Sequence, residues 1–117
     1  MLEGPCKVVI VEGLSDKKQI EKIISEDVEV ICTNGTIGIA KLDELLYDYD
    51  LDYRDVFIMV DEDKAGNRLR KLLARELPHA QHIHISSEFR EVAAAPHYAV
   101  ATALAAKRIA VDPLYLL

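Results

Sequence analysis

The chain of 117 residues lacks any apolar run that approaches the roughly 20 residues needed to cross a bilayer as a helix. Its first residues also lack the basic start and the apolar stretch of a secretion signal. These absences exclude a membrane protein of the helical class. We therefore expect a cytoplasmic protein with no membrane partner.

Cysteine is also scarce. Cys6 and Cys32 are the two cysteines, and their spacing is not that of a metal site. We expect two reduced thiols, as is typical of the cytosol. A disulfide between them stays geometrically possible if the first two strands are neighbours.

Internal repeats, low-complexity segments and linkers are absent as well. A chain of this length is expected to form one domain, residues 1–117, around one sizeable core. The net charge of −6 argues against a broad, nonspecific affinity for phosphates. Part of this charge lies in residues 43–55, which we interpret as a solvated helix face and a turn.

The sequence alternates apolar runs with amphipathic stretches. Runs rich in β-branched residues predict strands at residues 7–11, 28–33, 56–60 and 81–85. Helical spacing of apolar residues predicts helices from Ser15, as N-cap, to 25, and at residues 37–50, 65–77 and 96–109. The apolar tail, residues 111–117, either packs on the core or meets a partner. This alternation predicts an α/β fold, a four-stranded parallel sheet with helices on both faces and the last strand at an edge.

Two acidic motifs stand directly after predicted strands. Glu12 and Gly13 follow the first strand, and Asp61, Asp63 and Gly66 follow the third. Ligands of open α/β sheets bind outside the carboxyl ends of the strands. The three carboxylates could converge there as hard oxygen ligands, and their mutual repulsion calls for a cation such as Mg²⁺, with Mn²⁺ as a substitute. For the two motifs to meet, the first and third strands must be adjacent, so this chemistry predicts the strand order 2-1-3-4.

Simpler structural roles exist for the same residues. Asp61 and Asp63 could cap a helix, and Glu12 could be a favourable charge at a helix N-terminus. Asp16 could stabilise the first helical turn or orient the site from outside the ligand set. Gly13 allows a tight turn, and Gly66 lets the backbone turn into a helix beside an anionic ligand.

Candidate contacts to nucleic acid lie near these motifs. Asn34 and Gly35 end the second strand on the same rim and could contact phosphate or sugar, although a simple Asn-Gly turn explains them without any function and is the interpretation we prefer. Arg68, Lys71 and Arg75 share one helix face and could follow a phosphate backbone. The alternative is a solvated face that pairs with a neighbouring glutamate.

The motifs Glu12-Gly13-x-x-Asp16 and Asp61-x-Asp63-x-x-Gly66, in this order and each at a strand end, resemble those of the Toprim domain. Topoisomerases, bacterial primases, some nucleases and recombination-repair proteins share that domain. The resemblance covers residues 7–86. The flanking residues 33–35 and 65–70 resemble in particular the Toprim ribonuclease that matures a small ribosomal RNA.

The resemblance implies a Rossmann-like Toprim fold and metal-dependent phosphoryl transfer, with Glu12 as general acid or base or as a further metal ligand. The larger partner domains of those enzymes are missing, so we expect a small, free-standing Toprim protein. The first hypothesis is a magnesium-dependent, ribonuclease-like phosphodiesterase. The alternative is a non-catalytic module that binds RNA or DNA within a larger protein or ribonucleoprotein assembly, and a homodimer also stays open. The carboxylate trio favours the first hypothesis, and the acidic balance and small size favour the second.

Overall fold

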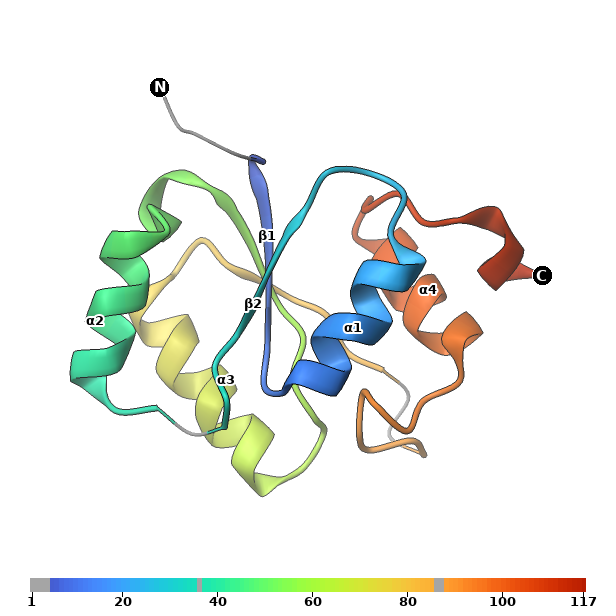
Figure 1. Cartoon of the computed structure of the whole chain (residues 1–117). Coiled ribbons are helices and arrows are strands. Elements are labelled where there is room, and N and C mark those ends of the chain that lie inside the picture. Colours follow the sequence, from blue (N-terminus) through green and yellow to red (C-terminus); the bar gives the residue numbers. More distant parts are fainter. Residues whose placement is uncertain (1–4, 36, 86–87) are drawn as a thin grey trace.

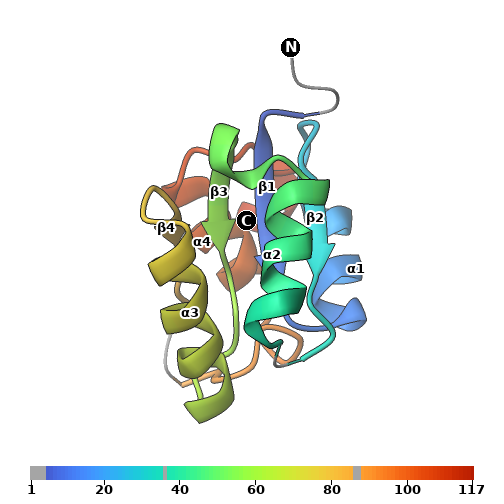
Figure 2. The same ribbon diagram turned by 90° about the vertical axis from the view of Figure 1, so that its left-hand side faces the viewer.

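The centre of the molecule is a parallel sheet of four strands, β1 (Lys7–Val11), β2 (Glu29–Cys32), β3 (Asp55–Ile58) and β4 (Gln81–His82). In the computed structural model, which describes residues 5–35, 37–85 and 88–117, the strands lie in the order β2-β1-β3-β4. Figure 2 shows this order with the sheet behind two helices. The predicted α/β class and strand order are confirmed.

Helices cover both faces of the sheet, as Figure 1 shows. On one face lie α1 (Leu14–Ile23) and α4 (His97–Ala106), and on the other lie α2 (Ile39–Asp48) and α3 (Lys64–Glu76). Two short 3₁₀ turns, η1 (Leu51–Tyr53) and η2 (Pro113–Leu116), complete the elements. No helix in the described ranges is long and apolar enough to cross a membrane.

The central position of β1 in the sheet explains why its residues 8–11 are all apolar and do not alternate with polar ones. Val9 and Val11 point into the core cluster under α1 and α4, whereas Val8 and Ile10 point into the cluster under α2 and α3. Both faces of this central strand are therefore buried, as is usual in parallel sheets. The carboxyl ends of β1 and β3 lie side by side, because the register of the two strands pairs Ile10 with Ile58.

Several predicted bounds were too long. The strand predicted at residues 81–85 is regular only over Gln81 and His82, and one further backbone hydrogen bond of 2.8 Å runs from the Ile83 N–H to the Ile58 carbonyl oxygen. The helix predicted to reach residue 50 ends at Asp48, and Asp50 turns into the left-handed region with φ 52°. The helix predicted to reach residue 109 ends at Ala106, before a second left-handed residue, Arg108.

The C-terminal tail packs on the core at its start. Val111 forms an antiparallel bridge with Ile24 and is buried, whereas Leu114 and Leu117 are exposed. The possible disulfide is not formed, and Cys6 and Cys32 are free. Cys6 precedes β1 and Cys32 ends β2, so the parallel direction of the two strands puts the thiols at opposite ends of the sheet.

Candidate functional site

The two acidic loops meet because β1 and β3 are neighbours. The Glu12 side chain follows β1, and its Oε1 accepts a hydrogen bond of 2.9 Å from the backbone N–H of Asp61, which follows β3. Glu12 and Asp61 are thus brought together as the sequence predicted. Each loop also fixes the position of the other at the end of the sheet.

The first loop enters α1 through one half of a capping box, a single hydrogen bond from the backbone of the N-cap residue to a side chain three residues later. Gly13 is the N-cap, and Asp16 Oδ2 accepts from the Gly13 N–H at 3.0 Å. The expectation that Ser15 caps this helix was wrong, because the helix already begins at Leu14. Of the two roles left open for Asp16, the structure shows that of a helix-start residue, and the side chain is almost fully buried.

The second loop enters α3 through Asp63. Its Oδ1 accepts from the Gly66 N–H at 2.8 Å, so Asp63 is the N-cap of α3. Gly66 packs directly on the preceding loop, since a Cβ atom at this position would lie 1.9 Å from the carbonyl oxygen of Asp61. The glycine is therefore required for the close approach of α3 to the acidic loop, and not for a left-handed backbone.

A segment that the sequence did not associate with the site covers the second loop. The N–H of Val92 donates to Asp61 Oδ1 at 2.9 Å, and the N–H of Glu62 donates to the carbonyl oxygen of Arg90 at 2.6 Å. Arg90 takes a positive φ of 55° to make this contact. This irregular segment has no apolar periodicity, so nothing in its sequence pattern placed it beside Asp61.

A hollow of about 480 Å³ opens between these loops. It is lined by side chains from both acidic loops, from the end of β2 and from the covering segment: Glu12, Gly13, Ser15, Asp16, Asn34, Gly35, Asp61, Glu91 and Ala93. The hollow lies at the carboxyl ends of β1, β2 and β3, where ligands of open α/β sheets bind.

Burial is the main reason why the carboxyl groups here titrate unusually. It raises the pKa values of Glu12, Asp16 and Asp61 above their ordinary range, although each group accepts a backbone hydrogen bond that acts in the opposite direction. Repulsion adds to the rise, since Asp61 and Asp63 raise the pKa of Glu12 and Asp63 raises that of Asp61. The site therefore gains from a nearby positive charge.

The donor set fits a hard divalent cation. Glu12, Asp61 and Asp63 each use one oxygen to accept a backbone N–H, and within the described residues the second oxygen of each has no hydrogen-bond partner. Oxygen ligands of this type suit Mg²⁺. In the described part of the chain, however, no three acidic, histidine or cysteine side chains converge on one point, since Asp63 is turned towards Gly66.

Asn34 and Gly35 lie on the rim of the hollow as predicted, and they also form a turn. Both have positive φ values, 60° and 99°. The Gly35 N–H donates to the carbonyl oxygen of Glu12, and Asn34 Oδ1 accepts from the Cys32 thiol at 3.2 Å. The turn therefore joins the end of β2 to the first acidic loop.

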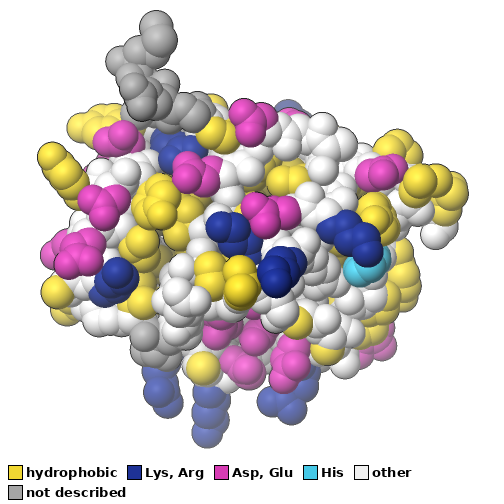
Figure 3. Space-filling model, viewed as in Figure 1, with side chains coloured by type: hydrophobic (Ala, Val, Ile, Leu, Met, Phe, Trp, Pro, Cys, Tyr) yellow, Lys and Arg dark blue, Asp and Glu magenta, His cyan; other side chains and the backbone are white. Residues whose placement is uncertain are grey.

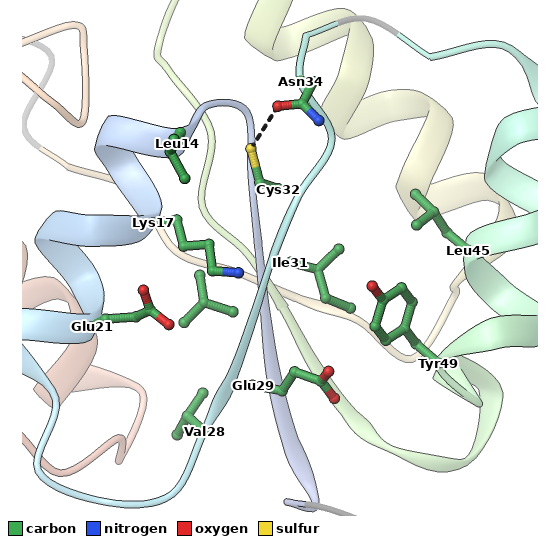
Figure 4. A pocket seen from close by; sticks show the side chains of 11 residues that line it. Leu14, Lys17, Glu21, Val28, Glu29, Ile31, Cys32, Asn34, Leu45 and Tyr49 are labelled. Carbon is green, nitrogen blue, oxygen red and sulfur yellow. Dashed lines mark hydrogen bonds between the residues drawn. The ribbon is translucent and has the colours of Figure 1, made fainter.

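Asn34 also borders a second hollow, of about 420 Å³, along the outer edge of β2 (Figure 4). Lys17 and Glu21 of α1 point into it from one side, and Leu45 of α2 and Tyr49, which directly follows α2, border it on the other. This groove follows the strand away from the acidic loops. The acidic residues Asp61 and Asp63 do not line it.

The predicted basic residues stand on the outer face of α3. Arg68, Lys71 and Arg75 are exposed and form no ion pair with any other described residue, so the expected pairing with a glutamate is absent. Figure 3 shows basic side chains projecting from the lower end of the molecule, beside acidic side chains that gather there. That end carries the carboxyl ends of the strands.

Comparison with known proteins identifies the family. The model of the Toprim domain matches residues 7–87, which span all four strands and both acidic loops. The chain belongs to the Toprim family. A solved structure, that of a small TOPRIM domain protein from Bacillus stearothermophilus, is 41% identical and superimposes with a TM-score of 0.88 over 95% of this chain and 92% of that one.

Two kinds of curated relatives match in sequence. The uncharacterized protein YusF of Bacillus subtilis (strain 168) is 45% identical over 113 residues, which are 94% of this chain and 74% of YusF. Ribonuclease M5 1 of Ligilactobacillus salivarius (strain UCC118) is 30% identical over 82 residues, and ribonuclease M5 of Bacillus anthracis is 30% identical over 83. These matches cover 68% and 70% of this chain but only 42% and 43% of the ribonucleases.

Proposed function

We propose that this Toprim protein is a magnesium-dependent, ribonuclease-like phosphodiesterase that acts on nucleic acid. The observation that supports this most is the hollow at the carboxyl ends of β1 and β3, where Glu12 and Asp61 share a hydrogen bond and Asp63 follows two residues later. The similarity to proteins named ribonuclease M5 supports RNA as the substrate class.

Glu12, Asp61 and Asp63 would hold Mg²⁺, or Mn²⁺ in its place, through the oxygens that the backbone amides leave free. When bound, the metal supplies a Lewis acid that neutralises charge on a phosphodiester. The chain itself contributes orientation, because the Asp61 and Gly66 N–H groups fix one oxygen of Glu12 and of Asp63.

Glu12 is the residue that we assign to general acid or base chemistry. Burial and the neighbouring carboxylates raise its pKa, which brings the proton affinity of this group closer to that needed near neutral pH. Its hydrogen bond with the Asp61 N–H holds the carboxylate in one orientation.

The same surface would bind the nucleic acid. Asn34 and Gly35 lie on the rim of the hollow, and Arg68, Lys71 and Arg75 continue along α3 from the second acidic loop over about 10 Å of helix. An acidic hollow repels phosphates, so binding is expected to require the divalent cation and to weaken as the concentration of monovalent salt rises.

One observation favours a second candidate, an accessory module without activity of its own. The chain spans less than half the length of the ribonucleases M5 that it matches, and its net charge is −6. Such a module would bind RNA or DNA as part of a larger protein or ribonucleoprotein assembly, or as a homodimer. We place either form in the cytoplasm, where two free thiols are stable.

Incubation of the protein with labelled RNA and labelled DNA, over a titration of Mg²⁺, tests both candidates. For the enzyme, Glu12→Gln should abolish cleavage and leave binding largely intact, because the size of the side chain is kept and the base is lost. For the module, the wild type should bind without cleavage. In both cases Arg68→Glu should weaken binding more than the control Lys22→Glu, which lies at the far end of α1. Tight binding with a chelator present, or no binding with metal, would contradict both candidates.

A further inference from the structure

Arg70 differs from the other basic residues of α3 in its direction. Arg68 and Lys71 are exposed, whereas Arg70 points inward and only 8% of its surface is accessible. Among the described residues, Arg54 is the other buried basic residue, and it lies at the opposite end of β3. The sequence does not indicate this inward direction, because Arg70 stands among other basic residues of the same helix.

The guanidinium of Arg70 fills the gap where β3 and β4 separate. It donates to the carbonyl oxygens of Ile58, Val60 and Ile83 at 3.1, 3.3 and 3.2 Å. The Ile58 carbonyl oxygen also accepts from the Ile83 N–H at 2.8 Å, so the backbone pairing of the two strands reaches Ile83. Beyond that point, Arg70 bonds the carbonyl oxygens of Val60 and Ile83, which among the described residues have no strand partner across the gap.

The same guanidinium reaches the acidic loop through Glu62. Arg70 Nη2 lies 3.4 Å from Glu62 Oε1, and Nδ1 of His84 donates to the same oxygen at 2.8 Å. Glu62 stands between Asp61 and Asp63 in the chain, and its own N–H is bound by Arg90. The side chain of Glu62 is thus held away from its two neighbours, on the β4 side of the loop.

Stability alone gives little reason for an arginine at this position. A buried ion pair is often no more stabilising than apolar side chains of similar volume. Among the described residues, the buried Nε atom of Arg70 also has no hydrogen-bond partner, which is unfavourable. What a planar, forked group provides here is geometry, because it contacts β3, β4 and the loop at once.

We propose that Arg70 is a positioning residue for the carboxylate site: its guanidinium bridges the ends of β3 and β4 and holds Glu62, so that the loop of Asp61 and Asp63 keeps its place beside the hollow, which Asp61 lines. This inference rests on the proposed metal site. It assigns a function to a residue that touches neither the metal nor the substrate.

Two variants, Arg70→Lys and Arg70→Met, test whether Arg70 acts by positioning the loop, by its charge or by stabilising the fold. Arg54→Met is the matched control. Mn²⁺ binding is measured by calorimetry on folded protein. Both Arg70 variants should bind Mn²⁺ at least about tenfold more weakly than the wild type, the size of effect usual for residues that orient metal ligands. Arg54→Met should lose stability and keep its Mn²⁺ affinity.

The sign of the change is decisive. If Arg70 acted only through its charge, its removal would relieve repulsion of the cation, so Arg70→Met would bind Mn²⁺ more tightly and Arg70→Lys would resemble the wild type. If Arg70 served only stability, its variants would match Arg54→Met, with unchanged affinity. Either result would overturn the inference.

Amide hydrogen exchange, measured without metal, tests whether Arg70 holds the loop in place, and this test does not depend on the proposed function. In Arg70→Met, amides of residues 59–63 should exchange faster relative to those of β1, and in Arg54→Met they should not. Equal acceleration everywhere would overturn the inference even if the wild type binds Mn²⁺. A wild type that binds no Mn²⁺ would instead contradict the proposed function, while selective exchange would still support the positioning.

Discussion

The contact between Gly66 and the Asp61 backbone gives the sharpest prediction for the site. In Gly66→Ala, the new Cβ would lie 1.9 Å from the Asp61 carbonyl oxygen, whereas real Cβ atoms essentially never come within 3.0 Å of such an atom. The obstacle is backbone, so no side-chain rotation can relieve it. Helix α3 and the acidic loop must separate by at least about 1.1 Å.

Two opposing terms set the expected magnitude. Overpacking of this kind costs about 1–3 kcal/mol, and replacement of a helical glycine by alanine returns about 0.5–1 kcal/mol. We expect the free energy of unfolding of Gly66→Ala to fall by about 1–2 kcal/mol, and the melting temperature by roughly 4–8 °C. The displaced loop should also lose the 2.9 Å hydrogen bond between the Asp61 N–H and Glu12, and with it affinity for Mn²⁺.

Urea unfolding and Mn²⁺ calorimetry measure both effects. The matched control is Gly38→Ala, at the N-cap of α2, where a Cβ would meet nothing within 4 Å. The control should stay within about 0.5 kcal/mol of the wild type and keep its Mn²⁺ affinity. A Gly66→Ala protein that is as stable as the control would refute the reasoning from this contact.

Three further results are expected. In Asp63→Ala, the free energy of unfolding should fall by about 1 kcal/mol because the cap of α3 is lost. Asp63→Asn should keep the cap and lose Mn²⁺ affinity. Denaturant unfolding measures the stability of both variants, and calorimetry measures their Mn²⁺ affinity. The raised pKa values of Glu12 and Asp61 mean that the folded protein keeps protons that the unfolded chain has released. Stability without metal should therefore fall as pH rises above the ordinary carboxyl range, and urea unfolding from about pH 4 to about pH 8 should show a smaller fall for Glu12→Gln. Burial, and then the charge of Arg70, lowers the pKa of His82, so NMR titration should find this pKa below its ordinary value in the wild type and higher in Arg70→Met.

The sequence predicted the sheet because its signals were local. The β-branched run of β1 is buried on both faces, so its residues show where the centre of the sheet lies. The strand order came from chemistry, since Glu12 and Asp61 could meet only if β1 and β3 were neighbours. Both expectations are confirmed.

The parts that the sequence did not predict depend on contacts between distant segments. Val92 reaches Asp61 through a backbone N–H, which carries no residue-type signal. Arg70 stands among basic residues on a helix whose polar face was expected to be solvated, and only the position of β4 makes its inward direction favourable. For the same reason, Asp63 could not be assigned between cap and ligand before the start of α3 was known.

The backbone hydrogen bonds of the acidic side chains have an evolutionary consequence. Asp16, Glu12, Asp61 and Asp63 each accept an N–H that holds a loop or a helix start in place. A related protein without the proposed activity would still be under selection to keep these carboxylates for folding. Drift in such a lineage would show first on the exposed, unpaired outer face of α3, so those basic positions are better markers of retained function than the acidic motifs themselves.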